Sequence, residues 1–163
     1  MPSQAEIRAR FWKALKDDRT IMLGLEGGAA GDIQPMTALI EGKDEEDGPL
    51  WIFTARDTDL VGALGSSARA VAAFASKGHD LFASIHGTLT LDNDRQTIDR
   101  LWNPYVAAWF EGGKDDPRLT LLRLDPERAK IWLNATTLEA ATQWLFGRDP
   151  KEEYQDKVAE VSL

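Results

Sequence analysis

The chain has 163 residues, a formal net charge of −8 at pH 7 and no cysteine, which excludes disulfides, thiolate metal sites, iron–sulfur clusters and a cysteine nucleophile. Its length suits a single domain over residues 1–163. An acidic surface repels phosphate backbones and anionic membranes, and no apolar run approaches the roughly 20 residues that cross a bilayer. No signal-like apolar stretch opens the chain, so we expect a cytoplasmic protein that binds neither nucleic acid nor membrane.

The first third of the chain predicts a helix and then three strands. Residues 4–17 have apolar side chains at helical spacing behind a capping-box pattern, Ser3 with Glu6. Strands are predicted at 20–25, 33–40 and 50–54, with glycine-rich and acidic loops between them. Proline cannot donate to a strand ladder, so Pro35 predicts that the second of these strands lies at a sheet edge.

The middle of the chain predicts a short helix capped by Asp57 or Thr58, and strands at 69–76 and 81–91. Gly87 predicts a bulge or a close backbone approach in the last of these strands. The strand alternates in polarity, so two faces are expected: Phe82, Ser84, His86, Thr88 and Thr90 on one, and Leu81, Ala83, Ile85, Leu89 and Leu91 on the other. The polar face would contact solvent, a ligand cleft or a second subunit.

The last part of the chain predicts a helix beginning after Asp92 or Asp94, and then two strands around a turn at Asp125-Pro126. A further helix is expected at 136–147, ended by Gly147, followed from residue 148 by a charged and loosely held tail. Short strands with few helices between them favour a mainly β fold, a small β-barrel with peripheral α-helices.

Motifs for the commonest chemistries are missing. The two histidines, His79 and His86, have no carboxylate at a ligand spacing, so no metal site is expected. There is no G-x-S-x-G elbow, Walker A loop or G-x-G-x-x-G fingerprint. What remains is Thr54 at a strand end, followed by Arg56 and Thr58. These hydroxyls and the guanidinium are suited to a phosphate pocket, and the alternative is a capped helix beside a solvated arginine.

Three segments, "IQPMTA", "LWIFTARDTDLV" and "HGTLTLDNDRQTIDRLWNPYVAAWFEGGKDDPRLTLLRLDPERAKIW", together resemble the general stress protein 26 group. This group is part of the pyridoxamine 5'-phosphate oxidase-like, FMN-binding split-barrel superfamily. The most specific part of the resemblance is "LWNPYVAAWFEGGKDDP", residues 101–117. The resemblance implies a six-stranded split barrel that forms homodimers and binds flavin in two clefts at the subunit interface.

The resemblance also implies the cofactor contacts. Pro35, Met36 and Thr37 would meet the edges of the isoalloxazine ring, and Phe53 and Thr54 would contribute from the next strand. The turn after that strand, with Arg56 and Thr58, would hold the phosphate.

The chain departs from the superfamily at Gln34 and Leu60, where an arginine and a lysine are common. Losing two cations weakens a dianion site, and Arg56, or less directly Arg69, would have to compensate.

The aromatic residues of 101–117 leave two interpretations open. Trp102 and Trp109 would cover a flat ring or the dimer seam, with Gly112 and Gly113 letting the backbone turn, or they would fill the core. His86 would be an interface or cofactor contact rather than a proton carrier.

We therefore expect an FMN-binding stress-related protein, a flavin-dependent oxidoreductase of unknown substrate, with FAD or heme as less favoured ligands. The alternative is a non-enzymatic protein that stores or senses flavin, heme or another flat ligand on the same dimeric scaffold.

Overall fold

The computed structural model describes residues 2–43, 47–134 and 158–163. The helices are α1 (Gln4–Asp18), α2 (Asp59–Leu64), α3 (Arg95–Leu101) and α4 (Pro104–Trp109), with 3-10 turns η1 (Glu26–Gly28) and η2 (Gly113–Asp115). The strands are β1 (Thr20–Leu25), β2 (Gln34–Thr37), β3 (Leu50–Ala55), β4 (Ser67–Ala75), β5 (Leu81–Leu91), β6 (Leu119–Leu133) and β7 (Val158–Ser162).

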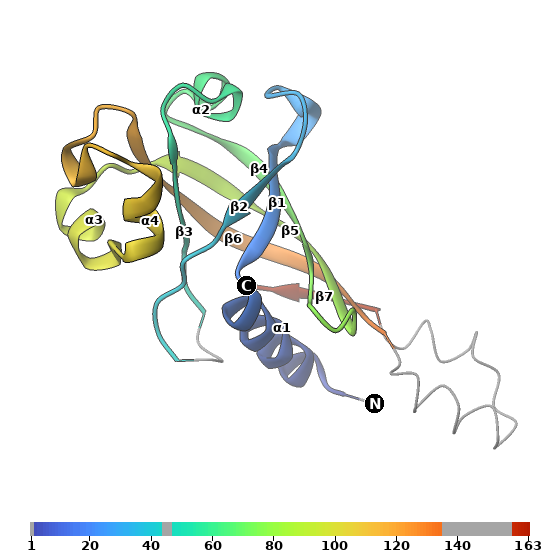
Figure 1. The fold of residues 1–163 in the computed structure, drawn as a ribbon. Coiled ribbons are helices and arrows are strands. Elements are labelled where there is room, and N and C mark those ends of the chain that lie inside the picture. The colour runs from blue at the N-terminus through green and yellow to red at the C-terminus, as the bar shows by residue number, and fades with distance from the viewer. Residues whose placement is uncertain (1, 44–46, 135–157) are drawn as a thin grey trace, which may run out of the picture.

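Six antiparallel strands in the order β2-β1-β4-β5-β6-β3 curl into a nearly closed barrel (Figure 1). β2 and β3 are the two edges of this sheet, as Pro35 predicts for its own strand. Beyond the strand ladders, one isolated bridge joins the two edges, with N–H···O bonds of 2.8 Å in both directions between Leu39 and Trp51. The expected mainly β split barrel with peripheral helices is therefore confirmed.

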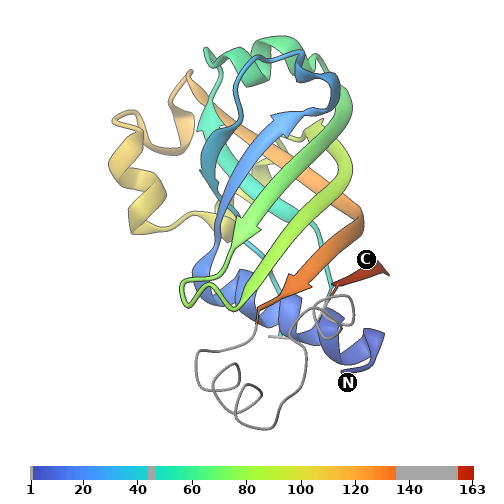
Figure 2. The ribbon, with the colours of Figure 1, turned by 90° about the vertical axis from the view of Figure 1, so that its right-hand side faces the viewer.

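The ends of the barrel are covered by helices. α1 lies across the lower end in both views and α2 lies across the upper end (Figures 1 and 2). The Ser3–Glu6 capping box forms at the start of α1, with bonds of 3.2 Å from the Glu6 N–H to Ser3 Oγ and 2.6 Å from the Ser3 N–H to Glu6 Oε2. Phe11, Trp12 and Leu15 of α1 are fully buried, so the helix adds to the core from below.

Two apolar clusters build the interior. The larger fills the barrel with the inward side chains of the strands and the buried faces of α1 and α2. The smaller lies outside the barrel wall, where α3 and α4 cover Trp51 and Phe53 of β3 and Leu119 and Leu121 of β6. The two clusters share β3 and β6, whose alternate residues face opposite sides.

The segment from Leu119 to Leu133 is one continuous strand, so the expectation of two strands around a turn at Asp125-Pro126 is wrong. Asp125-Pro126 lies at a β-bulge rather than at a turn, because the β5–β6 register shifts between His86 and Gly87. A Cβ at Gly87 would come closer than 3.0 Å to backbone atoms of Asp125 and Pro126. Gly87 thus allows the close backbone approach that the sequence predicts for it.

Two further expectations need correction. Leu91 does not face the core, since it is the last residue of β5 and its side chain is 38% exposed. β7 was not predicted, and it adds to the outer edge of β6 near the C-terminus. The expected helix at 136–147 and most of the expected tail from 148 lie outside the described residues. Within the described residues, no helix has the length and apolar character needed to span a bilayer.

Candidate functional site

The candidate residues from β2 and β3 line the two edges of the split barrel. Pro35 and Thr37 are exposed, whereas Met36 turns inward and packs against the main core. Apart from the Leu39–Trp51 bridge, β2 pairs only with β1 and β3 only with β6. An edge strand leaves a row of backbone N–H and C=O groups without ladder partners. These edges can therefore bind the polar rim of a flat ligand.

The upper end of β3 brings hydroxyl groups together. Thr54 and Thr120 are register partners on β3 and β6, and both side chains are buried. Thr120 Oγ1 accepts a 3.2 Å hydrogen bond from Asn93 Nδ2, and Asn93 Oδ1 accepts one of 2.7 Å from the Leu121 N–H. The strand ends are thereby held in a fixed geometry, with Thr54 next to the turn that carries Arg56.

The turn after β3 is arranged as the sequence predicts. Thr58 is the N-cap of α2, and its hydroxyl accepts a 3.3 Å hydrogen bond from the Val61 N–H. Arg56 is exposed, and its backbone N–H donates to the Arg118 carbonyl at 2.7 Å. Thr54, Arg56 and Thr58 therefore follow one another at the upper end of β3, with Thr54 buried, Arg56 exposed and Thr58 capping α2.

The two positions where the chain lacks a basic residue are explained by packing. Leu60 is 1% exposed and belongs to the main core, so it gives apolar contact beneath α2 in place of a charge. Gln34 is half-buried at the start of β2, paired in register with Leu23. Neither supplies a cation, and the basic residue at the end of β3 is Arg56.

The aromatic segment divides into a buried part and an exposed part. Trp102 is the C-cap residue of α3 and meets Phe53 edge to face in the smaller cluster. Trp109 and Tyr105 lie one turn apart on α4 and are 79% and 84% exposed. The core interpretation therefore holds for Trp102 and is wrong for Trp109. Two large exposed aromatic rings on one helix are typical of a contact surface.

The glycine-rich loop after α4 is closed by Asp116. Its Oδ2 accepts a 3.1 Å bond from the Gly112 N–H and its Oδ1 a 2.9 Å bond from the Arg118 N–H. These backbone donors hold the pKa of the Asp116 carboxyl below its usual value. Gly113 has φ +64°, and a Cβ on Gly112 would press on Asp116, so both glycines are needed for this turn.

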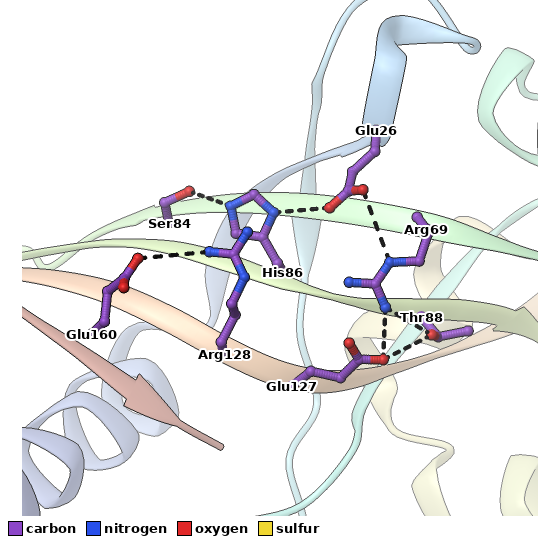
Figure 3. Close-up of polar contacts among 8 residues, drawn as sticks. All are labelled: Glu26, Arg69, Ser84, His86, Thr88, Glu127, Arg128 and Glu160. Carbon is purple, nitrogen blue, oxygen red and sulfur yellow. Dashed lines mark hydrogen bonds and ion pairs between the residues drawn. The ribbon is translucent and has the colours of Figure 1, made fainter.

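His86 lies on β5, which is not an edge strand, and it alternates with the β5 residues that face the core. Figure 3 shows its polar contacts. Its Nδ1 is 2.9 Å from Glu26 Oε1 and its Nε2 is 3.2 Å from Ser84 Oγ. Glu26 also lies 3.9 Å from Arg69, which binds Glu127 at 2.6 Å. The bond from His86 lowers the pKa of Glu26, and the bond from Arg69 lowers that of Glu127.

This outer network ties the η1 turn to three strands. Glu26 belongs to η1, His86 to β5, Arg69 to β4 and Glu127 to β6. Sequence reasoning missed it, because only strand register brings these residues together. The Arg69 guanidinium binds Glu127 within this network, so Arg69 does not replace the basic residues that are missing at Gln34 and Leu60. In the part of the chain that the structure describes, no group of three or more His, Cys, Asp or Glu residues could hold a metal ion.

Comparison with known proteins places the chain in a family. The family model described as pyridoxamine 5'-phosphate oxidase like matches residues 6–148. The chain belongs to this family. Solved structures of general stress proteins share its fold. A general stress protein 26 from Jannaschia sp. CCS1 is 30% identical, with a TM-score of 0.79 over 99% of this chain and 100% of that chain.

Two further relatives agree with this family. The general stress FMN/FAD binding protein from Xanthomonas citri is 58% identical, with a TM-score of 0.75 over 81% of this chain and 92% of that chain. The curated General stress protein 26 of Bacillus subtilis is 31% identical over 52 residues, which are 32% of this chain and 36% of that protein. The chain thus matches about a third of the length of this curated relative.

Proposed function

We propose that this protein binds a flavin nucleotide, FMN, at the split between β2 and β3. The observation that carries the proposal is the position of the two sheet edges, joined only by the Leu39–Trp51 bridge among the described residues, with Thr54, Arg56 and Thr58 at the upper end of one of them. The 58% identical relative from Xanthomonas citri is titled as an FMN/FAD binding protein, which supports the same ligand class here.

The ring end of the site suits an isoalloxazine. A flavin ring is flat and mostly apolar, with hydrogen-bonding atoms on its edges. Pro35 offers apolar surface on β2 and Thr37 an exposed hydroxyl, whereas Met36 supports this edge from the core side. Trp109 is exposed enough to cover a ring that lies against its face, from its own or a neighbouring chain.

The phosphate end suits a dianion. Arg56 supplies a guanidinium, and the Thr54 and Thr58 hydroxyls can each donate a hydrogen bond. The residues present therefore fit the phosphate of FMN.

A homodimer is part of the proposal. Within the bounds of β1, β2, β4 and β5, Arg69 is the only Asp, Glu, Lys or Arg, although 28% of the whole chain is charged. The outward residues Met22, Val71 and Ala73 leave the β1–β4 part of this wall apolar, beside the charged network of Glu26, Arg69 and Glu127. Such a charge-depleted surface is typical of the core of an interface between two copies of one chain.

When bound, flavin would supply the redox chemistry, and the protein would position the ring and exclude water. A flavin-dependent oxidoreductase is the favoured activity. The second candidate is a flavin-binding protein without catalysis. It is favoured by the position of His86, which is bonded to Glu26 and Ser84 on the outer wall and not at the split.

The test is the absorption spectrum of the freshly purified protein, followed by titration with FMN and riboflavin under flavin fluorescence. We expect flavin bands and saturable quenching by FMN. A heme Soret band would favour the alternative ligand, and absence of saturable FMN binding would overturn the proposal. Reduction of bound flavin by a nicotinamide donor, followed by transfer to an added acceptor, would separate the oxidoreductase from the non-catalytic protein.

A further inference from the structure

Arg56 and Arg118 are neighbours at the ends of β3 and β6. The β3–β6 ladder pairs Thr54 with Thr120 and Ala55 with Leu119. The next pair beyond the ladder is Arg56 with Arg118, joined by the 2.7 Å bond from the Arg56 N–H to the Arg118 carbonyl. Both residues lie in turns directly past the strand ends, and both side chains are exposed.

Neither guanidinium is used in a close ion pair among the described residues. Arg56 has no ion-pair partner there, and Arg118 Nε lies 3.8 Å from Asp116 Oδ1. Both oxygens of Asp116 already accept backbone N–H groups, so this carboxylate serves the glycine-rich loop. By contrast, Arg69 and Arg123 on the same sheet bind carboxylates at 2.6 to 2.9 Å.

Two adjacent cations without close partners are unusual in a chain with 27 acidic and 19 basic residues. Like charges that lie close together at two strand ends repel each other. A bound anion with two or more oxygens would remove that repulsion and use both guanidiniums, which bind phosphate through paired N–H groups. Thr54 and Thr58 lie beside the pair and can complete the donor set.

We infer that Arg118 acts together with Arg56 as a two-arginine clamp for the phosphate end of the flavin nucleotide. The inference rests on the proposed function, which assigns the phosphate to this corner but only Arg56 to its charge. The clamp supplies the second positive charge that Gln34 and Leu60 do not provide. The phosphate of FMN and the diphosphate of FAD share the chemistry that such a clamp recognises, and the test separates them.

The experiment measures dissociation constants of FMN, FAD and riboflavin for the full chain and for Arg56→Gln, Arg118→Gln and the double variant. Arg10→Gln is the control, because Arg10 is an exposed arginine on α1, at the opposite end of the barrel from α2 (Figures 1 and 2). Each single variant should weaken FMN binding about tenfold or more, as expected for a lost charge-assisted bond. Riboflavin binding should change less than about twofold, because riboflavin has no phosphate.

The double variant should bind FMN no more tightly than it binds riboflavin. Added salt should weaken FMN binding to the unmodified protein without weakening riboflavin binding, because salt screens the charge of the phosphate. A clamp that prefers the monoester dianion binds FMN more tightly than FAD, and the reverse order would assign it to a diphosphate. If the protein binds FMN but Arg118→Gln leaves the ratio of the FMN and riboflavin dissociation constants unchanged, the clamp is wrong and the proposed function stands. If the unmodified protein binds no flavin, both fail. Unchanged thermal melting would confirm that the variants fold.

Discussion

Phe53 and Trp102 meet edge to face, with ring centroids 6.0 Å apart and planes at 89°. Phe53 comes from β3, one edge of the split barrel, and Trp102 from the end of α3. The contact fixes the aromatic segment against the strand that carries Thr54 and leads to Arg56. The aromatic residues of 101–117 therefore have two roles, because some anchor the segment while Tyr105 and Trp109 remain exposed.

Replacing Trp102 should destabilise the fold. Trp102→Ala removes part of the smaller cluster and the ring contact with Phe53, so we expect a loss of about 2–4 kcal/mol in the free energy of unfolding. Urea denaturation followed by circular dichroism measures it. A loss below about 0.5 kcal/mol would show that the contact does not anchor the segment.

Replacing Trp109 should give the opposite pattern. Its side chain is 79% exposed, so Trp109→Ala should change stability by less than about 0.5 kcal/mol. If Trp109 covers the flavin ring, the same variant should raise the dissociation constants of FMN and riboflavin alike. Tyr105→Ala on the same helix is the matched control for loss of an exposed aromatic ring. A collapsed melting temperature with unchanged flavin affinity would assign Trp109 a structural role only.

Gly87 should tolerate no side chain. Gly87→Ala would push a Cβ into the backbone at Asp125 and Pro126, and we expect a loss of about 3 kcal/mol or more of stability. Gly62→Ala is the control, because a Cβ there meets nothing within 4 Å and Gly62 lies inside α2. That substitution should stabilise the protein by about 0.5–1 kcal/mol. Equal changes in the melting temperatures of the two variants would contradict the view that the bulge requires glycine at position 87.

The proposed homodimer predicts the effect of a charge on the apolar wall. Light scattering should give twice the chain mass for the unmodified protein at micromolar concentration. Ala73→Lys places a charge on an exposed position opposite Met22 and Ser84 and should give a folded monomer. Ala5→Lys, the same change at an exposed position of α1, should leave the dimer intact. If the unmodified protein is a monomer, flavin clefts shared between two subunits are ruled out.

Asp116 should make stability depend on pH in the acidic range. Backbone N–H groups of Arg118 and Gly112 lower its pKa in the folded state. Its contribution is therefore fully present above the unfolded pKa of about 3.9 and is lost as the pH falls through the lower folded pKa. Melting temperatures measured from pH 6 to pH 2 should fall less steeply for Asp116→Asn. Asp115→Asn, on a side chain that is 85% exposed, is the control from the same loop.

Much of the candidate site could be predicted from local sequence. Thr54, Arg56 and Thr58 follow one another along the chain, so a strand end and a helix cap suffice to place them together. The role of His86 could not be predicted. The alternation of β5 shows that His86 is on the polar side of the strand, but not which residues lie against that side. Glu26 and Arg69 show no local signal for their contacts, since they approach His86 only through pairing of distant strands.

The sequence alone determined the properties that depend on neighbouring residues: the α1 capping box, the edge position of Pro35, the bulge at Gly87 and the barrel class. Tertiary structure decided the rest. Only the tertiary structure showed that β6 continues through Asp125-Pro126 and that Arg118 lies next to Arg56. It also showed that Trp109 is exposed whereas Trp102 packs in the smaller cluster. The reason is that caps, turns and alternation act over a few residues, whereas strand register and helix docking depend on long-range packing of the whole barrel.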